Sequence, residues 1–376
     1  MMNTTKTIIT LAIALTLLLA LPVYGQSMQM ESQKLLANDA GLWDEFGTSV
    51  AIQGDTAFVG APWEGSYEGA AYVFTRRGNT WTQDAKLVAR HFGEEYNVMF
   101  GWSVALDGDT AVIGQADGEE VGTAHVFTRS DGVWTERAIL WSEYPDYAAH
   151  FGWSVDIDND TVLVTAPFEE RCNWDNFECY SGAAYVFTRT GGTWPQQAQL
   201  LAGDREDEDF GRSAALDGDT VLVASNGGVY AFTRSGDAWT ENARLPGGGP
   251  LAIDGDTAVV GKHVFVRSDG AWTQQATLPV EGNAVSIDGD TIVVGVASDD
   301  DERGAAYVFT RSGNAWTQQS VLIASDGAKS DNFGYSVAVH HDLVIAGAPY
   351  TNNYTGAAYV FDLSNSPDAA PMFIRS

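Results

Sequence analysis

The sequence predicts an all-β fold, a seven-bladed β-propeller built from four-stranded antiparallel blades. Three marks recur along the 376 residues in a fixed order: a tight turn such as "DGDT", a strand such as "YVFTR", and a tryptophan. The turn mark occurs seven times, at Asp55, Asp109, Asp160, Asp219, Asp256, Asp290 and Asp342. Repeats of a few dozen residues that consist of short β-strands are typical of propellers, in which each repeat forms one blade.

Each repeat unit reads as four short strands. In the second unit, residues 103–106 lead through a turn to residues 110–114, and residues 124–129 lead through another turn to residues 134–140. Glycine-containing turns between β-branched runs indicate hairpins. In the first unit, alternation over residues 81–87 predicts an outer strand that carries Trp81, Gln83, Ala85 and Leu87 on one face.

The two ends of the chain complete one another. The seventh unit stops after "FDLSNS" and has no fourth strand, whereas "QKLLA" at residues 33–37 resembles the end of another fourth strand, "QAQLLA" at residues 197–202. We therefore expect the N-terminal segment to complete the seventh blade and close the ring, which removes open sheet edges. The fifth unit is the shortest but has room for four strands. These boundaries give a linker at residues 26–32, a propeller at 33–363 and a tail at 364–376.

The first 25 residues have the pattern of a signal peptide. Lys6 is followed by an apolar run from Ile8 to Leu21 and by small residues that a peptidase would accept at Val23 and Gly25. The run is shorter than the roughly 20 residues that span a bilayer, and an uncleaved anchor is the alternative. We expect a protein that is secreted, periplasmic or on the cell surface, with no membrane insertion after cleavage.

Charge and cysteine content narrow the class of partner. The chain has 20 basic and 50 acidic residues, a formal net charge of −30, which repels phosphate backbones and disfavours nucleic acid as a partner. An extracellular protein or a glycan is the expected partner. Cys172 and Cys179 are the two cysteines of the chain, and in an exported protein we expect them to form a local disulfide.

Two motifs resemble a known family. The sequence "FG-x-S-V-A" followed by "V-G-A-P" is similar to the FG-GAP repeat of the integrin α-chain N-terminal propeller and its secreted bacterial relatives. The first half of the motif begins at Phe46, Phe100, Phe151, Phe210 and Phe333, and the second half is intact at residues 60–62 and 347–349. The resemblance implies a seven-bladed propeller that serves binding, often adhesion, and no single defined activity.

The chain departs from that family in its calcium loop. Members that bind calcium carry a loop such as D-x-D-x-D-G-x-x-D between the first two strands of a blade, whereas here "DGDT" or "QGDT" stands in its place. So short a turn cannot supply the six or more oxygen ligands of Ca²⁺, so no cofactor is expected, and calcium in the acidic loops stays an open alternative. The nearest metal candidates are Asp156, Asp158 and Asp160, and a solvated Asp156 in the central channel is the simpler interpretation.

Loop lengths indicate where binding takes place. The turns between strands one and two and between strands three and four lie on one face of the propeller, here called the turn face. The loops between strands two and three, and the linkers between blades, lie on the other, the loop face. Loop-face segments are long and rich in aromatic and acidic residues in blades 7, 1, 2 and 3, and loops on a rigid scaffold commonly carry binding. The candidate ligand-binding residues are Trp63, Tyr67, Tyr96, Trp141, Tyr144, Tyr147, His150, Trp174, Asp175, Phe177, Tyr180 and Tyr350.

The sequence therefore predicts a secreted, non-enzymatic binding or adhesion propeller. No G-x-S-x-G, H-E-x-x-H or P-loop motif is present, and no catalytic residue is assigned. The alternative is a secreted carbohydrate-active enzyme, a hydrolase or lyase, on the same face, which would need two carboxylates at the separation that glycoside chemistry requires. A repeat module without a small ligand is a third hypothesis.

Overall fold

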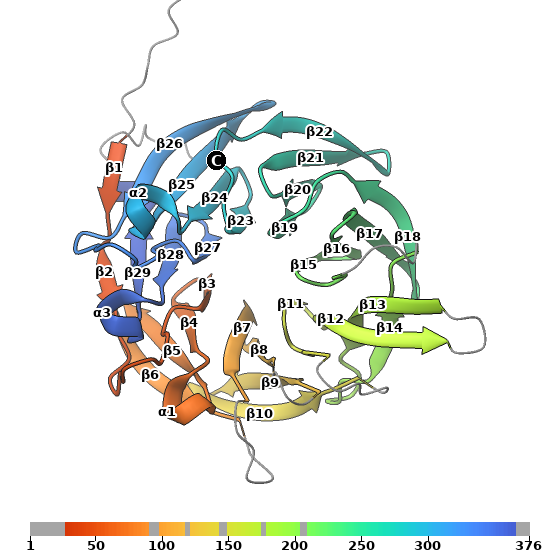
Figure 1. Cartoon of the computed structure of the whole chain (residues 1–376), viewed down its shortest axis with the longest axis horizontal. Helices are drawn as coiled ribbons and strands as arrows, with labels where there is room; N and C mark the ends of the chain where they lie inside the picture. Colours follow the sequence, from red (N-terminus) through yellow and green to blue (C-terminus); the bar gives the residue numbers. More distant parts are fainter. Residues whose placement is uncertain are drawn as a thin grey trace, which may run out of the picture.

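The computed structural model confirms the seven-bladed propeller (Figure 1). It describes residues 27–89, 98–116, 121–142, 149–173, 178–203 and 209–365, with the side chains of Ser66, Asn365 and residues 170–181 left out. Seven antiparallel sheets of consecutive strands surround a central axis, and the first strand of each blade lies innermost.

The strands follow the order expected from the repeats. Blade 1 contains β3 (Ser49–Gln53), β4 (Thr56–Ala61), β5 (Ala70–Arg77) and β6 (Thr80–Leu87). Blade 2 contains β7 (Phe100–Asp107), β8 (Thr110–Gln115), β9 (Thr123–Ser130) and β10 (Val133–Leu140). Blade 3 contains β11 (Val155–Asp158), β12 (Thr161–Asn173), β13 (Glu178–Thr188) and β14 (Gln196–Leu200). Blade 4 contains β15 (Ala214–Asp217), β16 (Thr220–Ser225), β17 (Gly228–Ser235) and β18 (Ala238–Leu245).

The short fifth unit also forms four strands, as expected. Blade 5 contains β19 (Leu251–Asp254), β20 (Thr257–Val260), β21 (His263–Ser268) and β22 (Ala271–Thr277). Blade 6 contains β23 (Ala284–Asp288), β24 (Thr291–Val296), β25 (Ala305–Ser312) and β26 (Ala315–Ile323). Blade 7 contains β27 (Ser336–His340), β28 (Leu343–Ala348), β29 (Ala357–Asp362) and the N-terminal β2 (Gln33–Leu35).

Ring closure by the N-terminal segment is confirmed, and one further strand was not expected. β2 pairs antiparallel with β29, and Leu35 is buried against blade 7. Residues 26–32 were expected to be a linker, but they contain β1 (Ser27–Met30), which pairs parallel with β26 as a fifth strand of blade 6. The outer edge of β26 offers free backbone groups, and the Gln29 side chain also donates to the Asp362 carbonyl.

The apolar cores lie between neighbouring blades. One cluster joins Tyr72 and Phe74 of blade 1 to Ile345 and Val360 of blade 7. Another joins Ala71, Val73 and Leu87 of blade 1 to Ile113 and Phe127 of blade 2. Each sheet is therefore covered on both sides, which explains why the inner three strands of a blade carry few charges.

The FG-GAP motifs bring neighbouring blades into close contact. Phe100 is fully buried with its ring edge-on to Phe127 of its own blade, at a centroid distance of 6.1 Å. The backbone of the next residue, Gly101, reaches the preceding blade, where a Cβ added at Gly60 would lie within 3.0 Å of the Gly101 carbonyl oxygen. The glycine of the G-A-P sequence in one blade is thus required because the FG backbone of the next blade approaches it so closely.

The turn, arginine and tryptophan marks form a brace on the turn face. In blade 2 the Arg129 Nε atom lies 2.7 Å from the Asp109 carboxylate, and its guanidinium carbon lies 5.2 Å from the Trp134 ring centroid. The same guanidinium donates to the Thr56 hydroxyl of blade 1 at 2.7 Å. The Arg–Asp pair recurs in blades 1 to 6, and Leu363 takes the arginine position in blade 7.

The fourth strands are less regular than the sequence predicted. Gln83 pairs with Phe74, but Ala85 pairs with Val73, so Asp84 is the extra residue of a β-bulge. Ala85 and Leu87 consequently face blade 2, whereas Trp81 faces blade 7. The expected single face for residues 81, 83, 85 and 87 was wrong, because a bulge shifts the alternation by one residue.

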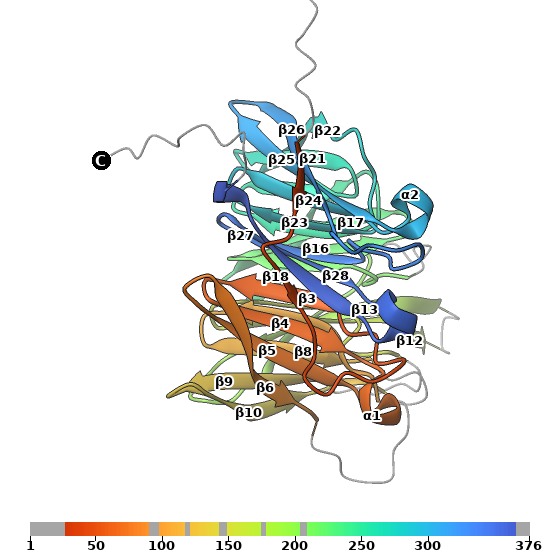
Figure 2. The same cartoon turned by 90° about the vertical axis from the view of Figure 1, so that its left-hand side faces the viewer.

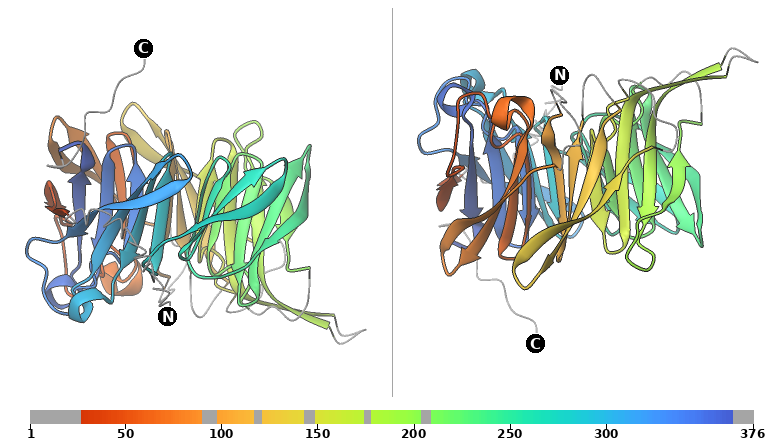
Figure 3. Two further views of the ribbon diagram at one scale, coloured as in Figure 1. Left: turned by 90° about the horizontal axis from the view of Figure 1, so that it is seen from above. Right: turned by 90° about the horizontal axis from the view of Figure 1, so that it is seen from below.

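The loop face carries the three single-turn helices. α1 (Glu64–Tyr67), α2 (Asp299–Glu302) and α3 (Thr351–Tyr354) follow the second strands of blades 1, 6 and 7 and lie on one side of the ring (Figure 2). The β12–β13 hairpin projects beyond the rim (Figure 3). The 3₁₀ turn η1 (Leu363–Asn365) ends the described chain. None of the described helices has the length and apolar character of a membrane span.

Candidate functional site

Aromatic side chains from separate segments meet where blades 7 and 1 adjoin on the loop face. The Trp43 ring stacks on Tyr354 with a centroid distance of 4.5 Å and an interplanar angle of 21°. Tyr350 lies 5.0 Å from Tyr354 between ring centroids. The Trp63 indole N–H donates to the Glu45 carboxylate at 3.0 Å. We call Trp43, Glu45, Trp63, Tyr350 and Tyr354 the seam cluster.

The backbone holds the segments of the seam cluster together. The Glu45 amide donates to the Tyr354 carbonyl at 2.8 Å, and the Trp63 amide donates to the Asp44 carbonyl at 3.4 Å. The linker between β2 and β3 thus lies between α3 of blade 7 and α1 of blade 1. Trp43 and Tyr354 remain 60% and 38% exposed, so the stacked pair forms part of the surface.

Burial changes the acidity of groups in and beside the seam cluster. Burial raises the pKa of the Glu45 carboxyl, and the hydrogen bond from Trp63 offsets part of this effect. Burial also raises the pKa of the Tyr335 hydroxyl, to which the nearby Glu45 charge adds. Tyr335 lies 5.8 Å from Tyr350 between ring centroids and extends the aromatic surface toward the central channel.

A second aromatic group surrounds the channel entrance over blades 2 to 4. The Trp102 and Trp153 rings lie 4.9 Å apart, and Trp153 contacts Phe168 edge-on at 5.4 Å. His150 lies 4.9 Å from Phe168, and the Arg212 guanidinium carbon lies 4.9 Å from the centroid of the same ring. We call Trp102, His150, Trp153, Phe168 and Arg212 the mouth cluster. Its indoles combine flat apolar surface with a guanidinium that is ion-paired with Asp209 at 3.0 Å.

The structure places some of the predicted binding residues and leaves others undescribed. Trp63 and Tyr350 belong to the seam cluster, Tyr67 lies against Trp63 at 5.4 Å, and His150 belongs to the mouth cluster. Trp141 is 59% exposed just after β10, with no ring contact to either cluster among the described residues. Six candidates and the side chain of a seventh lie outside the described residues: Tyr96, Tyr144, Tyr147, Trp174, Asp175, Phe177 and, for the side chain, Tyr180.

The sequence did not predict the cluster residues Trp43, Tyr354, Trp102, Trp153 and Phe168, or the adjoining Tyr335. Of these, Trp102, Trp153 and Tyr335 each follow an FG pair directly, at the position held by Thr48 and Arg212 in blades 1 and 4. Because that position starts the innermost strand of each blade, its side chains meet at the channel entrance. The residue after each FG pair was the signal that would have identified them.

The three metal candidates do not converge. The Asp158 carboxylate accepts the Gly218 amide at 2.8 Å, and Asp160 pairs with Arg189. Asp156, which was expected to be solvated, is partly exposed, and its two oxygens accept the amides of Ile157 and of Leu216 in blade 4 at 2.8 and 2.7 Å. Burial raises the pKa of Asp156 to about 7, and these amides oppose the shift. Among the described residues, no three His, Cys, Asp or Glu side chains are grouped as metal ligands.

The cysteines occupy opposing positions in the β12–β13 hairpin. Cys172 is the register partner of Cys179 on the neighbouring strand. Directly opposed residues in an antiparallel pair have Cα atoms about 4.5–5.5 Å apart, which is within the range of a disulfide. Their side chains lie outside the described part of the chain, and the disulfide stays a prediction.

A cavity of about 490 Å³ lies at the rim of blade 6, away from both clusters. Its lining includes Met28 of β1 and Asp299, Asp300 and Tyr307. The Tyr307 hydroxyl donates to Asp299, and burial together with this bond raises the pKa of Tyr307 to about 12. Its acidic residues are sequence neighbours, and blade 6 is outside the four blades predicted to bind ligand.

Comparisons with known proteins agree with the fold. One similar chain comes from a structure described as "Crystal Structure of Mitotic Checkpoint Complex". It is 12% identical in sequence with a TM-score of 0.58, and the alignment spans 96% of this chain and 99% of that chain. At 11% identity and a TM-score of 0.53, a putative 6-phosphogluconolactonase from Bacteroides uniformis ATCC 8492 covers 74% of this chain and is 85% covered. At such identities the likeness shows the fold alone. No curated protein matches the sequence.

The repeats themselves match a family model over more than half of the chain. The FG-GAP repeat model matches residues 30–74, 81–127, 134–187, 282–309 and 316–361. The unmatched stretch from 188 to 281 covers all of blades 4 and 5, where the loop between the second and third strands is shortest. The matched repeats and the seven-bladed ring show that this chain belongs to the FG-GAP repeat family.

Proposed function

We propose that this chain is an exported, non-enzymatic binding protein. Its propeller recognises an extracellular protein or glycan through the loop face of blades 7, 1, 2 and 3. The observation that carries this proposal is the stacked and exposed pair of Trp43 and Tyr354, which two distant segments bring together at the surface. Most large aromatic side chains of the propeller are buried between blades. Exposed apolar patches commonly mark interaction sites, so the exposed stacked pair favours a role in binding.

Backbone conformation supports a binding role for Trp43, which has a positive φ angle of 73°. The positive φ angles of Glu45 and Tyr354, 54° and 64°, recur at the equivalent positions Met99 and Tyr67 and belong to the repeat. Such angles are unfavourable for residues with large side chains, and they concentrate at functional sites where the surrounding structure maintains them.

The chemistry of the face favours ligands with flat apolar surfaces and polar or basic groups. Indole and phenol rings supply large, rigid contact areas, and residues of this type dominate binding energies at interfaces. Glu64, which pairs with Lys86 at 2.6 Å, and Glu68 follow Trp63 in the chain, and the net charge of −30 disfavours anionic ligands. A pyranose ring with its hydroxyl groups and a basic protein surface both meet these requirements.

Binding of the chain without residues 1–25 to a glycan array and to extracellular protein extracts tests the proposal. Trp43→Ala and Tyr354→Ala are expected to weaken binding by at least 2 kcal/mol, about thirtyfold, as a central aromatic anchor does. Trp102→Ala and Trp153→Ala test the mouth cluster in the same way.

A control separates the site from general surface effects. Val133→Ala removes a side chain that is 63% exposed on the turn face and is expected to leave binding unchanged. Trp141→Ala removes another candidate binding residue, as exposed as Trp43 but outside both clusters, and weaker binding would extend the site beyond them. Binding that survives all four cluster substitutions would contradict the proposal. Turnover of a bound glycan would instead support the enzyme alternative.

A further inference from the structure

The turn face carries a closed circle of hydrogen bonds between blades. The last residue of each innermost strand accepts a backbone amide from the first turn of the next blade. Four carboxylates do so at 2.6–2.9 Å, in the links from Asp107 to Asn159, Asp158 to Gly218, Asp217 to Gly255 and Asp254 to Gly289. A fifth carboxylate, Asp288, accepts the His341 amide of blade 7.

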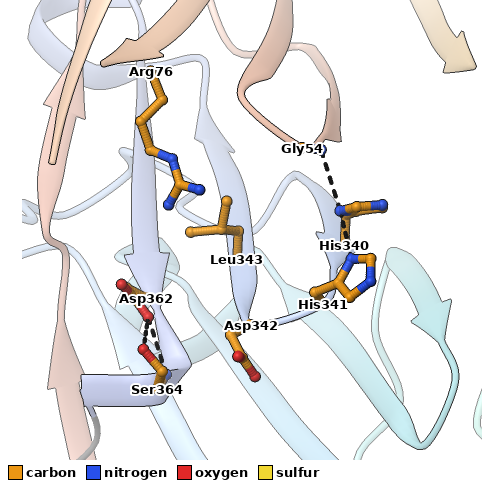
Figure 4. A pocket seen from close by; sticks show the side chains of 8 residues that line it. All are labelled: Gly54, Arg76, His340, His341, Asp342, Leu343, Asp362 and Ser364. Atoms are coloured by element: carbon orange, nitrogen blue, oxygen red, sulfur yellow. Dashed lines mark hydrogen bonds between the residues drawn. The ribbon is translucent and has the colours of Figure 1, made fainter. Parts of the chain in front are cut away.

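Two links in this circle use other acceptors, and both involve blade 1. The Gln53 side-chain oxygen accepts the Gly108 amide of blade 2 at 2.5 Å. The Gly54 amide of blade 1 donates to the Nδ1 atom of His340 in blade 7 at 3.2 Å, the longest of the seven links (Figure 4). Blades 7 and 1 form the seam of the ring, where the three-residue strand β2 pairs with β29 of blade 7 and the chain then continues into blade 1.

An imidazole acceptor differs from a carboxylate acceptor when it is protonated. A protonated carboxyl group retains a carbonyl oxygen that can accept, whereas Nδ1 has one lone pair, which a proton occupies. Nδ1 of His340 also lies 2.9 Å from Nδ1 of His341, so in the neutral state its one lone pair is shared between the Gly54 amide and the Nδ1–H of His341. Protonation of His340 would place two N–H groups against its Nδ1 proton.

The surroundings of His340 contain groups of both signs. His341 follows it in the turn, Asp288 lies on β23, and Asp55 lies in the adjoining turn of blade 1. Arg76, Asp342 and Asp362 line the same cavity of about 370 Å³ (Figure 4). Burial is the largest influence and lowers the pKa of His340 below its usual 6.5; His341 adds to this effect and Asp288 opposes it. The seam link therefore contributes its full stability above pH 6.5 and loses it as the pH falls further.

We propose that His340 is a pH-sensitive closure of the propeller: the neutral imidazole completes the circle of interblade hydrogen bonds, and protonation in mildly acidic surroundings opens the circle at the seam. The other links persist over this range because their acceptors keep an available oxygen. The same chain supplies the non-titrating comparison, since Gln53 makes the equivalent link from blade 1 to blade 2.

Amide hydrogen exchange over a pH series from 7.5 to 4.5, corrected for intrinsic rates, tests the proposal. The readout is the protection of the Gly54 turn divided by that of the Gly108 turn. In the wild-type chain this ratio is expected to fall roughly two- to twelvefold across the series as His340 becomes protonated, the range that the loss of one hydrogen bond gives. His340→Gln, which reproduces the acceptor found at Gln53, is expected to hold the ratio constant.

A second variant and a second measurement complete the test. His341→Asn copies Asn159, which has the same turn position and a φ of 53° against 54° for His341, and it is expected to keep the pH effect but shift it to higher pH. A ratio that does not change in the wild-type chain, or that falls equally in His340→Gln, would overturn the proposal. Should His340→Gln not fold, ¹⁵N chemical shifts of the wild-type ring give an independent answer, and an Nδ1–H tautomer at pH 7.5 would overturn it as well.

Discussion

Substitution of Gly60 by alanine tests whether close contact between blades requires the motif glycines. An added Cβ would lie within 3.0 Å of both the Gly101 carbonyl oxygen of blade 2 and the Ser49 hydroxyl, closer than real Cβ atoms come to such neighbours. The Ser49 hydroxyl donates to that same carbonyl at 2.8 Å, so the methyl group would also disturb an interblade hydrogen bond. Gly60 itself does not have a positive φ, so the cost arises from packing and not from backbone strain.

The expected loss of stability is about 1–3 kcal/mol, the range for overpacking in a closely packed interior. With a shift of roughly 2–4 °C per kcal/mol for chains of 150–250 residues, the thermal midpoint should fall by roughly 2–12 °C. Differential scanning calorimetry of Gly60→Ala, Gly248→Ala and the wild-type chain measures this shift.

Gly248→Ala is the matched control for Gly60→Ala. It also lacks a positive φ, and its nearest neighbour, the Ser225 carbonyl oxygen, lies 3.7 Å from the added Cβ, an ordinary contact. The double variant Ser49→Ala with Gly60→Ala should recover only part of the loss, because the Gly101 carbonyl stays in place. Equal midpoints for Gly60→Ala and Gly248→Ala would refute the explanation of the motif.

Further predictions concern closure, the disulfide and Asp156. Deletion of residues 26–30 should leave the propeller folded. Deletion of residues 26–35, which removes β2, should lower the free energy of unfolding by at least the roughly 2–5 kcal/mol that a buried leucine contributes. Equal losses of stability in calorimetry would contradict the role of β2. Reduction of the predicted Cys172–Cys179 disulfide should loosen one hairpin and leave the midpoint nearly unchanged, whereas a fall of tens of degrees would contradict this. Because the pKa of Asp156 is raised to about 7, its native form binds more protons than its unfolded form between pH 4 and 7, so its contribution to stability falls as the pH rises. The stability of Asp156→Asn relative to the wild-type chain should therefore increase from pH 4.5 to pH 8 in denaturant titrations, and the opposite trend would contradict the assignment.

The sequence predicted the architecture because each blade repeats the same local signals. The turn aspartates, the strand phenylalanines and the shared "QKLLA" and "QAQLLA" endings determine seven blades and the strand that closes them. The bulge at Asp84 was not predictable, because alternation continues unchanged through the letters of the strand and only pairing with Phe74 and Val73 reveals the extra residue.

The candidate site was predicted less completely than the fold. Trp63, Tyr67 and Tyr350 were predicted because they lie in long loops. Trp43 lies in the linker between β2 and β3, and only the folded ring shows that this linker lies between α1 and α3. Trp102 and Trp153 lie at strand starts, where the repeat pattern suggests packing. Their contact depends on the curvature of the ring, which brings the starts of successive innermost strands together.

The seam cluster consists of residues from both sides of the ring's closure, and this has a thermodynamic consequence. A ligand held between Trp43 and the α1 and α3 turns would bind the closed ring and not an opened one. Occupancy and closure are then linked, so that a ligand at a hundred times its dissociation constant would stabilise the fold by about 2.7 kcal/mol. By reciprocity, whatever loosens the contact between blades 7 and 1 lowers the affinity for that ligand by the same factor.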